Sequence, residues 1–427
     1  NTATEHYYLY LNISNNTFLY TQNENIPELL LTIKDAGGNA VTDITSLTYK
    51  TVTDGKGTSI TGYDITNKSG VITLFDNREI TASPTKTDEW NITVTLVNYD
   101  KDQSNNMGKS FNAKLMIQKE KIKETVTDVC SNGQTLSSCI IAMDGKDDTL
   151  YHHTSSLTNG AGDNSYRYAG ASDKVNNFVC FGTNAATCPT DNLYRIIGVI
   201  DDKVKLIKYD YANSNLLGTN GDYDGSSTPD SSTYKGSLTS IDTYSWNNVT
   251  NKNTWSESNL NKINLNTNFI NNIGSTWANK IATTTWKVGG NTFDNIGSSV
   301  PSIAYQNEIV APAENTTYDA KIGLMYVSDY GFAASPSAWT TTLYNYDGND
   351  AKGTSIKTIN WMYMGYYDWM ISRTSAFSNS AFVVYGGGFV SNGNVSIGIG
   401  VRPSFNLLSS ITYVSGSGSA VDPILIN

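Results

Sequence analysis

The first 119 residues consist of short runs in which apolar and polar side chains alternate, and this period restricts the local structure more than any other feature. Apolar side chains recur at Tyr7, Leu9, Leu11 and Ile13. Side chains two residues apart lie on the same face of a β-strand. The pattern therefore predicts a half-buried strand that ends at Asn15-Asn16.

Similar runs follow this first strand and are separated by Gly, Asn and Asp, which favour turns. They lie at residues 28–33, 47–52, 70–75, 89–96 and 113–118. Several short strands at such spacing are typical of a β-sandwich. The sequence therefore predicts a β-sandwich over residues 1–119.

The composition excludes several partners. Charged residues make up only 16% of the 427 residues, and Asn, Thr, Ser, Gly and Tyr supply the polar surface instead, as in a β-rich extracellular protein. The 29 Lys and Arg against 39 Asp and Glu give a net charge of −10, which attracts neither nucleic acid nor an anionic membrane. No apolar run approaches roughly 18 residues, so we expect no membrane span.

Four cysteines occur as two local pairs, Cys130 with Cys139 and Cys180 with Cys188. An even number at hairpin-like spacing predicts two short-loop disulfides, although four cysteines allow three connectivities. A zinc site is the weaker alternative, because neither pair has the two-residue gap that is usual in thiolate centres. Disulfides predict an oxidising, extracellular location.

Histidine is nearly absent from the chain, which restricts catalysis. The chain has only His6, His152 and His153, and none of them accompanies a G-x-S-x-G or H-E-x-x-H motif. The adjacent pair His152 and His153 would face opposite sides of a strand, and we interpret both as surface loop histidines. Carboxylates are plentiful, but no spacing selects an acid and base pair. We expect no catalytic residues and no enzyme activity.

We place a domain boundary after residue 119, followed by a linker and disulfide-bearing lead-in at 120–189. From residue 190 a second domain begins. Two apolar runs, at 193–199 and 204–208, flank Asp201-Asp202 and predict a β-hairpin.

Helical spacing occurs only at residues 255–265 and 268–281, and short strands in Gly-rich loops fill the rest of the chain. The expected fold is therefore mainly β with a small α component. An N-terminal β-sandwich is followed by an α+β domain at 190–427.

Two segments resemble known families. The run LLLTIKDAGG at residues 29–38 resembles the opening hairpins of immunoglobulin-like modules on bacterial cell surfaces. The second segment resembles a C-terminal module of surface proteins from gut Bacillota. The motifs that carry this resemblance are YRIIGV at 194–199, IGLMYV at 322–327, WMYM at 361–364, WMISR at 369–373, GVRPSF at 400–405 and DPILI at 422–426.

That module is similar to the C-type-lectin-like fold, including the formylglycine-generating-enzyme branch and the variable proteins of diversity-generating retroelements. The resemblance covers about residues 190–427 and implies display or ligand binding rather than catalysis. No Cys follows Cys188, so the sulfatase-activating chemistry of one branch is rejected. The Glu-Pro-Asn, Gln-Pro-Asp and Trp-Asn-Asp motifs of calcium-dependent sugar binding are missing as well.

Aromatic residues gather at 361–369, where flat rings could meet the CH faces of sugars. We expect Trp361, Tyr363 and Trp369 to pack in the core, because alternate residues of a strand face inward. The candidate ligand-binding residues are Tyr366, Tyr367, Arg373 and Tyr385. For Arg402, which precedes Pro403, we expect a structural ion pair.

A calcium site is a weaker expectation. Asn220, Asp222 and Asp224 place oxygens at alternate positions, as in the first half of a calcium loop. Ser231 stands where such a loop needs its closing Glu, and Asn and Asp favour plain turns for backbone reasons alone. We therefore expect no cofactor and keep Ca²⁺ as the alternative.

These observations favour a non-enzymatic protein of the bacterial cell surface. It would be a subunit of a surface appendage or an adhesin with a lectin-like head. In an appendage, the strand with Tyr7, Leu9, Leu11 and Ile13 would join a neighbouring subunit by strand exchange and build a homopolymer. The alternative is a solitary adhesin or phage-type receptor-binding protein that binds a glycan or a host-surface protein. A Lys to Asn isopeptide bond within the first domain is a further expectation for such a protein.

Overall fold

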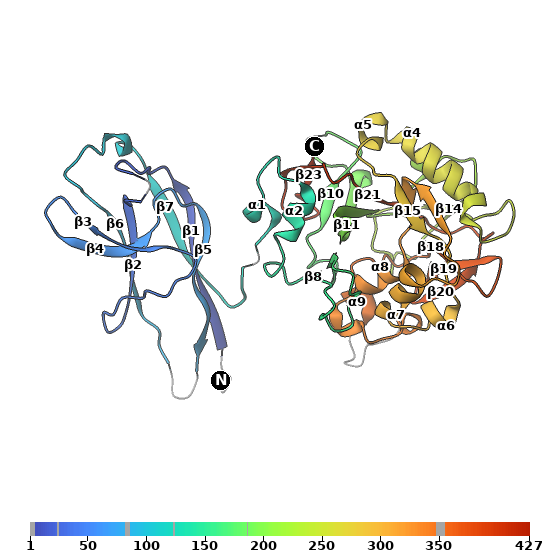
Figure 1. Ribbon diagram of the computed structural model, residues 1–427, viewed down its shortest axis with the longest axis horizontal. Coiled ribbons are helices and arrows are strands. Elements are labelled where there is room, and N and C mark those ends of the chain that lie inside the picture. Colours follow the sequence, from blue (N-terminus) through green and yellow to red (C-terminus); the bar gives the residue numbers. More distant parts are fainter. Residues whose placement is uncertain (1–4, 24, 82–85, 123, 186, 347–354) are drawn as a thin grey trace. The chain divides into compact units, whose positions relative to one another are not determined.

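The computed structural model describes residues 5–23, 25–81, 86–122, 124–185, 187–346 and 355–427. The chain divides into two compact units, Asn1–Lys123 and Glu124–Asn427 (Figure 1). Strands account for 33% of the residues and helices for 17%, which confirms the mainly β fold with a small α component.

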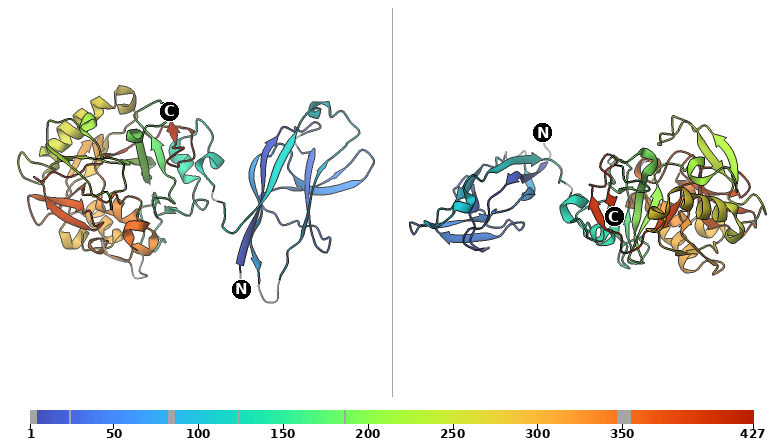
Figure 2. Two further views of the ribbon diagram at one scale, coloured as in Figure 1. Left: turned by 180° about the vertical axis from the view of Figure 1, so that it is seen from behind. Right: turned by 90° about the horizontal axis from the view of Figure 1, so that it is seen from above.

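The first unit consists of two antiparallel sheets with the strand orders β5-β1-β7 and β3-β4-β2-β6. Its elements are β1 (Glu5–Asn16), β2 (Leu29–Asp35), β3 (Tyr49–Thr53), β4 (Ser59–Asp64), β5 (Gly70–Ile80), β6 (Trp90–Leu96), the short helix η1 (Ser104–Asn106) and β7 (Phe111–Gln118). Figure 2 shows these strands from behind and from above. The strands predicted in this region are present, and β4 is an additional one.

One apolar core joins the two sheets of the first unit. Leu9 and Leu11 of β1 lie in the same buried cluster as Leu29 and Leu31 of β2. The alternating residues of β1 therefore face the opposite sheet, as their period predicts. The first unit is a β-sandwich.

The second unit contains several small sheets and short helices. Its strands are β8 (Leu150–His152), β9 (Tyr166–Tyr168), β10 (Phe178–Cys180), β11 (Leu193–Ile200), β12 (Lys203–Lys208), β13 (Tyr223–Ser227), β14 (Ile241–Tyr244), β15 (Thr284–Lys287), β16 (Thr317–Ala320), β17 (Ile322–Gly323), β18 (Asp368–Arg373), β19 (Ser380–Val384), β20 (Val390–Asn394), β21 (Ser404–Asn406), β22 (Tyr413–Ser415) and β23 (Leu425–Ile426).

Its α-helices are α1 (Val126–Val129), α2 (Leu136–Ile141), α3 (Ser214–Leu217), α4 (Ile270–Asn272), α5 (Ser275–Ala278), α6 (Phe293–Ile296), α7 (Pro301–Tyr305), α8 (Val327–Phe332) and α9 (Ile356–Ile359). The 3₁₀ and π segments are η2 (Thr190–Asn192), η3 (Trp255–Glu257), η4 (Leu260–Phe269), η5 (Gln306–Val310), η6 (Pro336–Ala338) and η7 (Leu343–Asn345).

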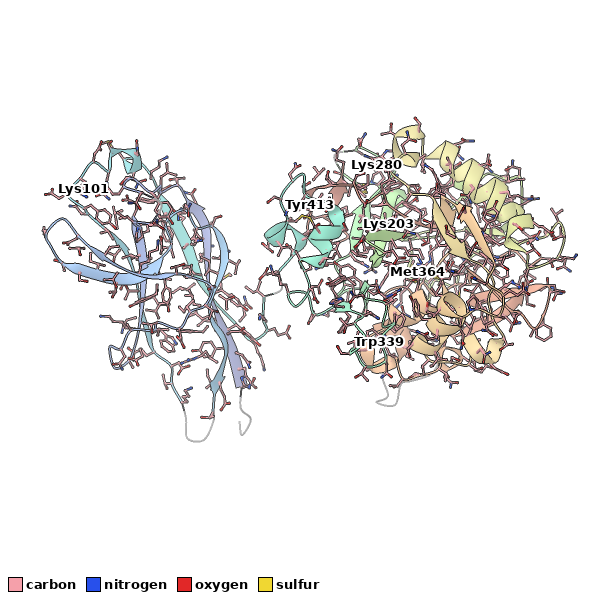
Figure 3. All side chains as sticks on the ribbon, in the orientation of Figure 1. Lys101, Lys203, Lys280, Trp339, Met364 and Tyr413 are labelled. Atoms are coloured by element: carbon pink, nitrogen blue, oxygen red, sulfur yellow. A yellow bond between two sulfur atoms is a disulfide. The ribbon has the colours of Figure 1, made fainter. Side chains whose placement is uncertain are left out.

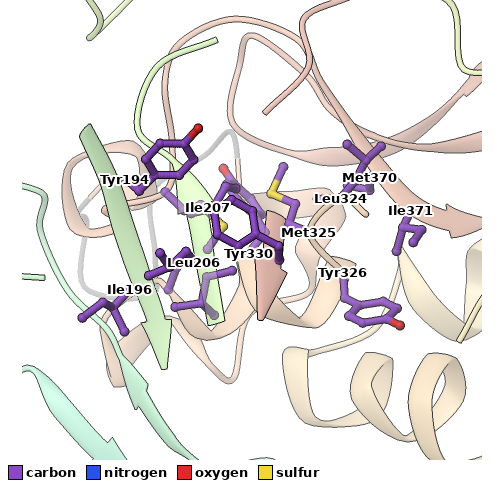
Figure 4. Packing of buried hydrophobic residues seen from close by; sticks show 14 of the residues in the cluster. Tyr194, Ile196, Leu206, Ile207, Leu324, Met325, Tyr326, Tyr330, Met370 and Ile371 are labelled. Carbon is purple, nitrogen blue, oxygen red and sulfur yellow. The ribbon is translucent and has the colours of Figure 1, made fainter. Parts of the chain in front are cut away.

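The largest sheet of the second unit has the order β17-β21-β12-β11-β9-β8, and β10 also pairs with β11. β8, β9 and β10 lie in the stretch predicted as a lead-in at 120–189. That part of the domain prediction is corrected: the second unit begins at Glu124, because β9 and β10 both pair with β11. Figure 4 shows side chains of β11 and β12 packing with those of residues 324–330 in the main core.

The hairpin of β11 and β12 confirms the prediction for residues 193–208. Its two connecting residues, Asp201 and Asp202, have φ angles of 49° and 60°. Positive φ at both central positions fits the tight turn whose twist matches paired strands. Asp tolerates this conformation better than most residues.

The predicted helical region is also present, with different boundaries. Instead of two helices meeting near residue 268, η4 continues directly into α4, and Gly274 with a φ of 78° separates them from α5. Glycine adopts such an angle without steric cost, which explains why the chain turns there.

Both predicted disulfides are formed, Cys130–Cys139 and Cys180–Cys188, and both lie in the second unit. Among the described residues, no helix is both long and apolar enough to cross a membrane.

Candidate functional site

A pocket of about 390 Å³ opens in the second unit. Its lining includes the turn side of β11 and β12, the strand β15, the helices α7 and η5, and the start of α8. We call it the charged pocket, because Asp163, Arg167, Lys203, Lys205 and Asp329 all line it. Its size falls in the range of about 300 to 1,000 Å³ that is usual for small-molecule sites.

Arg167, Lys205 and Asp329 form a buried ionic network on one side of this pocket. Arg167 Nη1 lies 3.1 Å from Asp329 Oδ1, and Lys205 Nζ lies 2.5 Å from Asp329 Oδ2. Arg167 also pairs with Asp163, with 2.8 Å between Nη2 and Oδ2. The network thus alternates cation and anion, so each buried charge has a partner of opposite sign.

The positions of these charges follow from the sheet and from α8. Arg167 lies on β9 and Lys205 on β12, while Asp329 caps α8 by accepting a hydrogen bond from the Tyr326 backbone N–H at 2.9 Å. Burial lowers the pKa of Lys205, and the nearby Asp329 opposes that effect. Burial also acts against the ionised form of Asp163, but the charge of Arg167 lowers the pKa of Asp163 overall.

Aromatic rings form part of the pocket wall. The Lys205 ammonium lies 4.5 Å from the centre of the Tyr326 ring and 5.5 Å from that of Trp286. The Arg167 guanidinium lies 5.6 Å from the centre of the Tyr305 ring. Such contacts stabilise buried cations and leave flat apolar surface for a ligand.

The rim of the charged pocket is polar. Thr283 and Thr285 are exposed on either side of Thr284, and Asp201 is exposed at the turn. Lys203, which Figure 3 labels, is half-buried, and it forms no ion pair with any residue that the structure describes. The rim therefore offers hydroxyl groups and the cations of Lys203 and Lys287 to a ligand.

Sequence reasoning did not find this pocket. Its residues come from β9, β12, β15, η5 and α8, which are far apart in the chain. A usable signal was present in β12, where Lys205 stands between Val204 and Leu206 in a predicted apolar strand. A charged residue inside a buried strand must find a partner, and that partner was not recognisable from the sequence.

The predicted aromatic surface forms a separate feature of the second unit. Tyr367 and Tyr385 lie 5.0 Å apart between ring centres, and Tyr385 stacks on Phe389 at 4.8 Å. Tyr366 extends the series at 5.7 Å from Tyr367, and Tyr344 lies 5.7 Å from Phe389. We call these five residues the aromatic row. Tyr367 is 40% exposed and Tyr344 is 49% exposed.

The structure separates Arg373 from the other predicted ligand-binding residues. Tyr367 precedes the first residue of β18 and Arg373 is its last, where it pairs with Glu314 at 2.7 Å. Trp361, Tyr363 and Trp369 are buried, as predicted.

Arg402 forms the structural ion pair that the sequence predicts. Its Nε lies 2.5 Å from Asp368 Oδ2, and both residues are buried. A second donor of the guanidinium, Nη2, reaches the backbone oxygen of Met362 at 2.8 Å. Burial raises the pKa of Asp368 to about 6, although the Arg402 charge acts in the opposite direction.

The predicted calcium loop uses its oxygens for internal hydrogen bonds. Asp222 is buried and accepts from the backbone N–H of Leu260 at 2.9 Å and of Asn248 at 3.1 Å. Asn220 Oδ1 accepts from Asn268, whereas Asp224 is exposed. Within the described ranges, no group of three or more His, Cys, Asp or Glu side chains is arranged to hold a metal ion. Calcium binding stays a prediction.

The proposed assembly strand is the middle strand of its own sheet. Tyr7, Leu9, Leu11 and Ile13 belong to β1, which pairs with β5 on one edge and with β7 on the other. Strand exchange would therefore require β1 to leave two partners, so β1 is not a free strand.

The prediction of two surface histidines is wrong for His153. Its ring is buried against Phe332 and Trp339, with centroid distances of 4.8 and 5.1 Å. Its Nδ1 accepts a hydrogen bond from the backbone N–H of Ala161 at 3.0 Å. Burial lowers the pKa of His153 to about 3. His152 lies on β8 with a half-buried ring that stacks on Tyr166.

No family model matches the chain, and neither a curated protein nor a solved structure matches it.

Proposed function

We propose that this chain is a non-enzymatic extracellular adhesin of the bacterial cell surface, and that its second unit binds a glycan in the charged pocket. The observation that supports glycan binding is that one pocket of about 390 Å³ combines an aromatic wall, a rim of hydroxyl groups and a buried ionic network. Few other ligand classes combine apolar CH faces with many hydroxyl groups. Flat aromatic rings pack against the CH faces of a sugar, and fixed polar groups form hydrogen bonds with its hydroxyl groups.

A binding role fits the ionic network better than a catalytic one. The ammonium of Lys205 already lies against Asp329, and the guanidinium of Arg167 is shared by two carboxylates. Groups held in this way cannot easily take up or release a proton. They can instead keep Tyr305, Tyr326 and the rim at fixed positions, and this preorganisation reduces the entropy lost on binding.

Two disulfides and a surface rich in neutral polar residues support an extracellular location. The β-sandwich would then serve as a spacer that carries the binding unit. Between the two predicted forms, the central position of β1 in its own sheet favours the adhesin that does not polymerise over the appendage subunit.

The test is a glycan array probed with the labelled full chain. We expect binding to a limited group of saccharides and about a tenfold loss of affinity for Lys203→Met, which removes one of the two lysine cations of the rim. Lys101→Met is the matched control, because Lys101 is an exposed lysine of the first unit (Figure 3). An array without signal, or equal binding by both variants and the wild type, would contradict the proposal.

The aromatic row is a second candidate surface, favoured by its exposed Tyr344 and Tyr367. Tyr367→Ala tests it on the same array. If this variant loses binding while Lys203→Met keeps it, the ligand stacks on the aromatic row and the charged pocket has another role.

A further inference from the structure

The first unit holds a fully buried carboxylate without a cationic partner. The exposed fraction of Glu28 is 0%, and among the residues that the structure describes it forms no ion pair. A buried charge of this kind is costly unless several hydrogen bonds compensate it. The hydrogen-bond donors to the Glu28 carboxylate are unusual, because they include both a side-chain hydroxyl and a side-chain carboxamide.

Thr21 and Gln103 meet at this carboxylate. The Thr21 hydroxyl and the Thr21 backbone N–H both donate to Glu28 Oε1, the latter at 2.9 Å. The side-chain amide of Gln103 donates through Nε2 to Glu28 Oε2. One carboxylate therefore holds a nucleophile on one oxygen and an acyl group on the other.

The Gln103 amide is held by hydrogen bonds at both its oxygen and its nitrogen. Its carbonyl oxygen Oε1 accepts a hydrogen bond from the backbone N–H of Tyr99 at 3.1 Å, and its nitrogen also donates to the backbone oxygen of Val97 at 2.9 Å. An N–H aimed at a carbonyl oxygen stabilises the negative charge that develops there when a nucleophile attacks.

We propose that Thr21 and Gln103 react to form an intramolecular ester bond, with Glu28 as the general base. The Thr21 Oγ1 forms a bond to the Gln103 side-chain carbon Cδ, and the bond from Cδ to Nε2 breaks. Glu28 takes the hydroxyl proton and delivers it to the leaving nitrogen, so that one ammonia molecule is released. The step needs no oxidant or other reactant.

Position and burial both support this step. Thr21 follows β1 and Gln103 precedes β7, so the bond would tie the first strand of the unit to the entry of its last strand. Holding both reactants on one carboxylate turns their reaction into an intramolecular one. Glu28 is fully buried, and Thr21 and Gln103 are half-buried, so the reacting groups are shielded from part of the solvent.

The mass of the intact chain with its disulfides reduced tests this proposal. We expect a mass lower than that of the expressed sequence by one ammonia molecule. Trypsin, which cleaves after Lys34, Lys101 and Lys109, should leave residues 1–34 linked to residues 102–109. Fragmentation of that linked peptide should place the bond between Thr21 and Gln103.

Two variants remove the reaction in different ways. Thr21→Val removes the nucleophile, and Glu28→Gln removes the base while keeping the size of the side chain. Both should have the full sequence mass, whereas the control Thr32→Val, which changes a hydroxyl on β2, should keep the mass deficit.

A wild-type chain of full sequence mass would overturn the proposal, and this result does not depend on whether a variant folds. A deficit of one water would also overturn it, because Lys50 Nζ lies 2.9 Å from Asp64 Oδ2 and an amide between these two would release water. A deficit of one ammonia located in a lysine-containing link would instead support the isopeptide expected from the sequence.

Discussion

At the residue scale, Asp329 compensates two buried cations, Arg167 and Lys205. Asp329→Asn keeps the size of the side chain but removes the charge that both cations require. We expect the unfolding free energy of the second unit to fall by about 3 kcal/mol. Chemical denaturation of the full chain measures this change. Asp201→Asn, an exposed carboxylate at the same pocket, is the control, and equal stability of the two variants would show that the network is not needed.

His153 makes stability depend on pH. Burial lowers the pKa of His153 to about 3 from the ordinary histidine value of 6.5, so the unfolded chain binds more protons between these values. Stability should therefore fall as the pH falls through this window, by up to about 5 kcal/mol. Unfolding free energies between pH 7 and pH 4 measure the effect. His153→Gln should flatten this dependence and His152→Gln should not; the reverse result would assign it to His152.

At the element scale, Asp222 fixes the start of the helix formed by η4 and α4. Its carboxylate accepts from the Leu260 backbone N–H, one of the donors that a helix start leaves unpaired. Asp222→Ala should lower the unfolding free energy by about 1–2 kcal/mol. Thermal unfolding compares it with Asp224→Ala, the exposed neighbour in the same loop. If Asp224→Ala is the more harmful change, the loop has a role other than capping.

The elements that the sequence predicted well are those with local causes. β1 follows from its period of two, and the hairpin of β11 and β12 follows from two apolar runs around a short polar turn. β4 was missed because Gly62 interrupts its pattern. A Cβ at Gly62 would lie 2.9 Å from the backbone oxygen of Leu31, so a close approach to β2 explains this glycine.

The candidate site could be predicted only in part. Tyr366, Tyr367 and Tyr385 are neighbours in the structure, because their positions near the facing ends of β18 and β19 follow from strand pairing. The charged pocket depends on tertiary pairing instead. Arg167 and Asp329 are 162 positions apart, and no local pattern connects them.

At the scale of the whole molecule, each unit has its own apolar core, and both disulfides lie in the second unit. Reduction should therefore destabilise only the second unit, by about 2–3 kcal/mol per short loop. Calorimetry of the full chain with and without reductant measures this effect. A lower unfolding temperature for the first unit would contradict the assignment.

Above all, we propose that the charged pocket of the second unit binds a glycan. The most direct measurement is a crystal structure of the full chain with the saccharide that gives the strongest array signal. We predict saccharide density between Tyr305, Tyr326 and Lys203. Density only on the aromatic row, or on the first unit, would contradict the account.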